Sequence, residues 1–177
     1  MRALILTTAL LFSSGAFAAG TSDDSPPQPT ETSTTCENGQ VWDQQTEACV
    51  DAKESRIDDD TRYAAARELA YAGRYDDALL VLSAMSDQTE SRVLTYYGFA
   101  NRKAGRTEIG MQYYRDALEA NPDNLLARSY MGQGLVESGD LKAARVQLAE
   151  IVARGGASTW PETSLRRAIK SGRTYNY

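Results

Sequence analysis

Three glycine turns recur along this chain at nearly constant spacing, and they restrict its possible folds more than any other feature. Gly73, Gly105 and Gly139 follow one another at almost equal intervals. A small residue stands five positions after each glycine and a larger one nine positions after it: Ala78, Gly110 and Ala144, then Leu82, Tyr114 and Leu148. A period of about 34 residues indicates stacked supersecondary units. Because a single helical hairpin cannot bury its own apolar face, we expect a cooperative stack.

The segment from Ser91 to Asn124 carries the most complete version of this pattern. Its characteristic residues are, in order, Leu94, Gly98, Gly105, Tyr114, Ala117 and Pro122. With these residues the segment resembles a full tetratricopeptide repeat, and the ranges 58–88 and 125–156 resemble degenerate copies. The resemblance implies an all-α helical-hairpin solenoid of about three repeats over 58–156. In such a fold, Gly98 and Gly132 would let the first helix of a repeat approach the second closely.

Local signals mark where the helices of this stack begin and end. Pro122 cannot continue a helix and pushes Asn121 toward an extended conformation, so a helix ends there. Asp123 and Asn124 are both candidates to cap the next helix. Pro161 and the polar residues around it start a last helix, which we interpret as a cap helix within 157–171. Binding of this helix to anionic lipid is the alternative, and 172–177 is predicted to be a frayed tail.

The resemblance also indicates which residues would contact a partner, because family geometry places fixed positions of the first helices on the concave face. These predicted partner-binding residues are Tyr63, Arg67, Tyr71, Arg92, Phe99, Arg102 and Gln133. Tyrosine, phenylalanine and arginine are the residue types that dominate binding interfaces. We therefore expect a groove for an extended or helical peptide with acidic groups. The alternative is that the rings pack on neighbouring repeats and the arginines are merely solvated.

One known family function can be tested on the residues themselves. Members that bind chaperones hold a terminal carboxylate with lysine, asparagine and arginine side chains. The matching positions here are Tyr63, Arg67, Tyr96, Leu126 and Tyr130. Arg67 alone among them has suitable chemistry, so a carboxylate clamp is not expected.

The N-terminus has the pattern of an export signal. Met1 and Arg2 precede an apolar run over 3–12, and Ala16-Phe17-Ala18 fits a small-x-small cleavage site. The run is shorter than the roughly 20 apolar residues that a membrane span needs. We therefore predict a signal peptide over 1–18, cleavage after Ala18, and an exported, periplasmic product without a transmembrane segment. A membrane anchor is the alternative.

Two cysteines lie shortly after this signal. Cys36 and Cys49 are predicted to join in a disulfide hairpin over 36–50, as an oxidising compartment favours. Trp42 between them either covers the bridge or contacts a sugar or peptide. The range 19–35 is rich in Ser, Thr and Pro and is predicted to be a disordered linker, and 51–57 is a second, shorter linker.

Composition excludes several kinds of function. The chain has no histidine and two cysteines, so it can form neither a Ser-His-Asp triad nor a zinc site that contains histidine. The net charge of −5 argues against nucleic acid as a partner. Residues 19–60 carry 11 acidic and two basic side chains, whereas residues 154–177 carry one acidic and five basic side chains. This acidic arm and the basic end could attract each other, bind separate partners, or simply be solvated.

The sequence therefore predicts a non-catalytic module for protein–protein interaction, without cofactor or metal. The partner is a protein or peptide, and self-association stays possible. An architectural subunit with an obligate interface is the alternative from another class. A glycan-associated protein or hydrolase is less favoured, because the acidic runs Asp76-Asp77 and Asp58 to Asp60 have the positions of ordinary helix-start charges.

Overall fold

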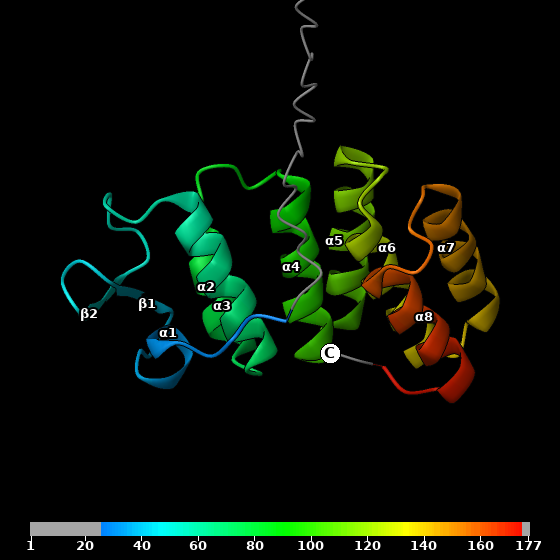
Figure 1. The fold of residues 1–177 in the computed structure, drawn as a ribbon, viewed down its shortest axis with the longest axis horizontal. Coiled ribbons are helices and arrows are strands. Elements are labelled where there is room, and N and C mark those ends of the chain that lie inside the picture. Colours follow the sequence, from blue (N-terminus) through cyan, green and yellow to red (C-terminus); the bar gives the residue numbers. More distant parts are fainter. Residues whose placement is uncertain (1–25, 175–177) are drawn as a thin grey trace, which may run out of the picture.

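A computed structural model describes residues 26–174, so the predicted signal peptide, residues 19–25 and residues 175–177 lie outside the described part. The described chain is mostly helical, as predicted, with one small antiparallel hairpin near its start (Figure 1). Its elements are α1 (Glu31–Thr34), β1 (Gln40–Asp43), β2 (Ala48–Asp51), α2 (Asp59–Tyr71), α3 (Tyr75–Ser83), α4 (Ser91–Lys103), α5 (Thr107–Ala120), α6 (Leu125–Glu137), α7 (Leu141–Ala153) and α8 (Trp160–Ser171).

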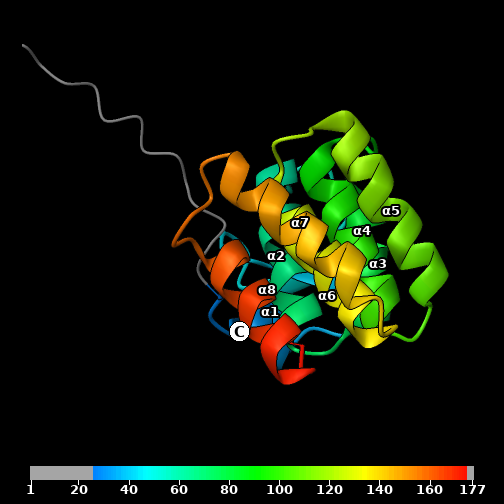
Figure 2. The ribbon, with the colours of Figure 1, turned by 90° about the vertical axis from the view of Figure 1, so that its right-hand side faces the viewer.

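The long helices form three antiparallel pairs that follow one another in a row. The pairs are α2 with α3, α4 with α5, and α6 with α7, and α8 packs on both helices of the last pair. Within the row, α4 also contacts α2 and α6. Figure 2 shows α8 and α1 on one side of the row and α5 on the opposite side. One face of the row is therefore built mainly from α2, α4 and α6, which we call the inner helices.

The recurring glycines end the three inner helices in the same way. Gly73, Gly105 and Gly139 have φ values of 80°, 85° and 84°, in the left-handed region that glycine adopts without strain. The residue after each glycine returns its N–H to the helix, and the first of these bonds, from Arg74 to the carbonyl of Leu69, is 2.9 Å long. This C-terminal motif releases the chain for an immediate reversal.

The two glycines expected to permit close pairing have different partners. A Cβ on Gly98 would lie 2.5 Å from the ring of Tyr114, so Gly98 does let α4 approach α5. A Cβ on Gly132 would instead lie 2.6 Å from Leu165 of α8. The expectation that Gly132 serves the approach of α6 to α7 is thus wrong, because the space it leaves is filled by the last helix.

The hairpin and its disulfide follow the prediction closely. β1 pairs with β2 in an antiparallel register that places Trp42 opposite Cys49. Cys36 and Cys49 are bonded, with Cα atoms 5.5 Å apart. Val41 of β1 is 1 % exposed and belongs to the same apolar core as the first helices. The hairpin therefore covers the open end of the helical row.

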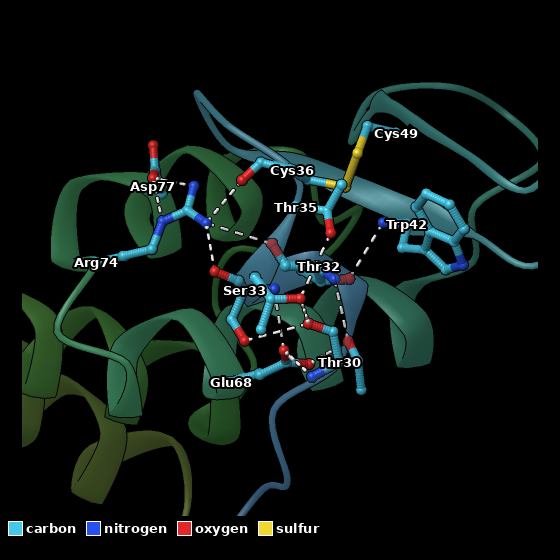
Figure 3. The surroundings of a disulfide bond; sticks show 11 residues. Thr30, Thr32, Ser33, Thr35, Cys36, Trp42, Cys49, Glu68, Arg74 and Asp77 are labelled. Atoms are coloured by element: carbon cyan, nitrogen blue, oxygen red, sulfur yellow. Dashed lines mark hydrogen bonds and ion pairs between the residues drawn. A yellow bond between two sulfur atoms is a disulfide. The ribbon is translucent and has the colours of Figure 1, made fainter.

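The described part of the linker predicted for 19–35, residues 26–35, contains a short helix and is not disordered as predicted. Residues 31–34 form α1, and Thr30 caps it by accepting the N–H of Thr32. The carboxylate of Glu68 on α2 accepts two hydrogen bonds from Thr30, one from its N–H at 2.6 Å and one from its hydroxyl at 2.7 Å (Figure 3). It accepts a third from the N–H of Ser33 at 3.0 Å. A polar segment is thus ordered by a buried acceptor that belongs to a distant part of the sequence.

The remaining helix ends agree with the sequence more closely. Asn124 is the N-cap of α6, and its side chain accepts the N–H of Ala127 at 2.9 Å. Asn121 is extended, with φ −145° and ψ 97°. The C-terminal tail is less free than predicted, since the Thr174 hydroxyl donates to Glu137 at 2.6 Å. Among the described residues, none of the helices has the length and apolar character needed to cross a bilayer.

Candidate functional site

The residues predicted to bind a partner lie on the inner helices but differ widely in exposure. Arg67 and Tyr71 on α2 and Arg92 on α4 are partly exposed. Tyr63 is 6 % exposed, and Phe99 is fully buried. The structure thus brings the three predicted aromatic residues together, and Tyr71 is the one among them that is partly exposed.

A cluster of five aromatic rings joins the three inner helices. The Tyr63 and Tyr96 rings meet edge to face with centroids 5.6 Å apart, and the Tyr71 ring stacks on Phe99 at 5.6 Å. Tyr130 of α6 packs on Phe99 at 4.9 Å, and its hydroxyl is hydrogen-bonded to that of Tyr71. Rings held in such offset and edge arrangements stabilise each other beyond their buried area. The cluster gives the inner helices a rigid apolar floor.

Sequence reasoning did not name Tyr96 and Tyr130 as binding residues, although both belong to this cluster. Tyr96 is fully buried and Tyr130 is 1 % exposed. They stand one repeat period apart, at equivalent positions of successive helical pairs. The repeat spacing was therefore the signal that could have identified them.

Two partly exposed guanidinium groups lie over these rings. The Arg67 Cζ is 5.9 Å from the centroids of both Tyr63 and Tyr96, and its Nε donates to the Tyr96 hydroxyl at 3.0 Å. The Arg92 Cζ lies 4.7 Å from the Tyr63 centroid. Positive charge over a ring face is attracted by the ring's quadrupole. We call Arg67, Tyr71, Arg92 and the rings of Tyr63 and Tyr96 beneath them the arginine–tyrosine face.

Carboxylates fix the position of Arg92 at the edge of this face. Its Nη1 is 2.8 Å from Asp60 and its Nε 2.5 Å from Glu90. Partial burial by itself lowers the pKa of Arg92, but these two carboxylates outweigh burial and raise it. Arg92 also lines an open groove of about 640 Å³, which runs over the first residues of α4 and α6 to Pro161 of α8. The arginine–tyrosine face therefore continues into a groove at one end of the helices.

Two polar residues among the predicted contacts are buried, as Phe99 is. Gln133 is fully buried and Arg102 is 3 % exposed. The Arg102 Nη1 is 2.6 Å from Glu137, and its Nε donates to the Tyr114 hydroxyl at 3.3 Å. Burial alone lowers the pKa of Arg102, yet Tyr114 and Glu137 raise it above its ordinary value, so the group stays charged. Arg102 joins α4, α5 and α6 and is a structural residue rather than a partner contact.

The acidic runs considered for catalysis have other partners in the structure. Asp58 caps α2 by accepting the N–H of Thr61 at 2.7 Å. Asp76 lies 2.9 Å from Arg106, and Asp77 lies 2.5 Å from Arg74. Within residues 26–174, no group of three or more His, Cys, Asp or Glu side chains is placed to hold a metal ion.

The chain was compared with known proteins. No protein-family model matches it, and the searches of curated proteins and of solved structures also return no match. Aromatic faces beside partly exposed guanidinium groups can bind carboxylates and apolar side chains without forming a covalent bond.

Proposed function

We propose that this chain is a non-catalytic protein-interaction module of the tetratricopeptide type, exported to the cell envelope. It binds a segment of a partner protein on the arginine–tyrosine face. The recurrence of matching residues at an almost constant period supports the family assignment. The apolar run and small-x-small site at the N-terminus, together with the disulfide, support export.

One observation carries the proposed binding function: partly exposed arginines lie over a packed aromatic floor that spans three helices. Rigid aromatic side chains lose little conformational entropy when they bind, and arginine can hold a carboxylate through two parallel hydrogen bonds. The preferred ligand is therefore an extended or helical peptide that offers an acidic side chain beside an apolar one.

An architectural subunit with an obligate interface is less well supported. Such interfaces are large and as rich in apolar side chains as the interior of a protein. The large exposed apolar side chains among the described residues are spread over three helices: Leu80 on α3, Ile109 on α5, and Leu141, Val146 and Val152 on α7. Exposed apolar residues scattered over several helices are normal on a protein surface.

Photocrosslinking in the cell envelope tests the proposal. Tyr71 is replaced by p-benzoylphenylalanine in one strain and Tyr113, which is partly exposed on α5, in a matched strain. We expect a protein adduct from position 71 that is absent from position 113. Adding Arg67→Gln and Arg92→Gln should reduce the adduct from position 71 at least fivefold, with the helical circular dichroism unchanged.

Two results would contradict the proposal. The first is equal adducts from positions 71 and 113, since both would then report chance encounters. The second is an adduct from position 71 that persists undiminished in the double arginine variant. In that case, the inner helices could still bind a partner, but by other chemistry than the arginine–tyrosine face provides.

A further inference from the structure

The chain that precedes α1 is anchored beside the arginine–tyrosine face. Glu68, the neighbour of Arg67 on α2, accepts three hydrogen bonds from Thr30 and Ser33. Arg74, which follows the C-terminal end of α2 and directly precedes α3, donates to the carbonyls of Ser33 at 3.0 Å and Cys36 at 2.7 Å (Figure 3). The disulfide from Cys36 adds a covalent constraint. The root of the N-terminal arm is therefore held in place next to this face.

The described chain also runs from this root in a defined direction. In Figure 1 the stretch 26–30, drawn in blue, runs from α1 across the front of the helices toward α4. Its sequence is PPQPT, and proline-rich segments favour an extended conformation with a rise of about 3.1 Å per residue. Asp24, six residues before Thr30, can thus reach about 19 Å from the root.

We propose that the acidic segment of residues 19–25, AGTSDDS, occupies the arginine–tyrosine face of its own chain, with Asp23 and Asp24 directed at Arg67. Charge complementarity and the position where the described chain begins both favour this occupant. Arg67 is favoured over Arg92 as the contact because of its position, since Glu68 beside it holds Thr30 and Ser33 at the root of the arm.

Tethering favours this segment over a second copy of the chain. A short linker gives a tethered ligand an effective concentration in the millimolar range. A separate copy at micromolar concentration would need roughly a thousandfold higher affinity to fill the face equally. An arm contact with a Kd of about 0.1 mM at an effective concentration of about 1 mM would weaken partner binding about tenfold. This competition rests on the proposed function, whereas the contact itself does not.

Carbodiimide crosslinking of the purified full chain tests the contact, since the reagent joins a carboxylate to an amine within contact distance. Arg67→Lys places an amine on the face, and Arg115→Lys places one on the exposed surface of α5 as a matched control. We expect a linked peptide between Asp23 or Asp24 and residue 67, at least fivefold above the link to residue 115. It should occur in monomeric protein and be independent of concentration. A link found only in a dimer, or equal yields at the two positions, would overturn the proposal.

A second measurement separates this inference from the proposed function. Asp23→Asn with Asp24→Asn should increase the photocrosslinked adduct from position 71 at least twofold, and an unchanged yield would overturn the competition. If the 23/24–67 link is absent while that adduct persists, the arm contact is wrong and the interaction function stands. If the link forms but no adduct appears, the arm contact stands and the proposed function is wrong.

Discussion

At the scale of single residues, the ion pair between Arg102 and Glu137 holds the middle of the helical row together. The Arg102 side chain is fully buried, whereas that of Glu137 is 36 % exposed. Burial by itself raises the pKa of Glu137, but the charge of Arg102 and hydrogen bonds from Arg102 and Thr174 outweigh burial and lower it. Because a lowered pKa means that folding favours the carboxylate, the pair links stability to pH.

Glu137→Gln should therefore destabilise the protein at neutral pH and not in acid. Hydrogen bonds to charged groups contribute about 1.5–3 kcal/mol, and solvent screening of the partly exposed Glu137 places the expected loss near the lower limit. The contribution is complete above the unfolded pKa of about 4.3 and is lost as pH falls through the lower folded value. Urea unfolding of both proteins at pH 7 and pH 3 measures this. An equal difference at both pH values would show that the pair does not act through its charge.

At the scale of elements, α1 depends on an acceptor that belongs to another helix. Glu68 is 7 % exposed and accepts hydrogen bonds from Thr30 and Ser33. Glu68→Gln replaces one of the two acceptor oxygens by an NH₂ donor. This donor cannot accept the hydrogen bonds that the Thr30 and Ser33 groups donate to the carboxylate. We expect α1 to detach, with hydrogen exchange at the Ser33 amide at least tenfold faster and exchange in α4 and α5 unchanged. Glu31→Gln, at an exposed position of α1 itself, is the matched control, and equal acceleration by both changes would contradict the role of Glu68.

The helices and the hairpin differ in how far the sequence could predict them. The ends of the inner helices follow from local signals, because a glycine with positive φ acts within its own turn. The disulfide hairpin follows from two cysteines and the polar turn between them. The order of α1 could not be predicted, since its residues read as a linker until Glu68 is placed beside them. Gly132 was assigned to the wrong neighbour for the same reason.

The candidate site was predictable to a similar degree. The resemblance to a tetratricopeptide repeat predicts that Tyr63, Arg67 and Arg92 share one face of the first helices, and the structure has them in contact on the inner helices. The resemblance could not show that Arg102 lies inside, because its burial depends on Glu137 and Tyr114 from two other helices. Residue type at a repeat position thus predicts the face of a helix, whereas exposure is decided by the neighbouring helices.

At the scale of the whole molecule, α8 closes the end of the row opposite to the disulfide hairpin. Leu165 of α8 is fully buried and fills the space beside Gly132 of α6. In a row where each helical pair is stabilised by its neighbours, loss of contacts at one end lowers the stability of all. The last helix is therefore predicted to unfold together with the pairs and not before them.

Leu165→Ala tests this cooperativity. Truncating a buried leucine typically costs about 2–5 kcal/mol, and the glycine facing it offers no side chain that could fill the space. We expect the urea midpoint of the helical signal to fall in one transition, with the slope m unchanged, since m reports the surface exposed on unfolding. Arg167→Ala, exposed on the same helix, should shift the midpoint by less than about 0.5 kcal/mol. A lower m or a separate early transition would instead mean that α8 unfolds by itself, and that the three pairs are stable without a closing helix.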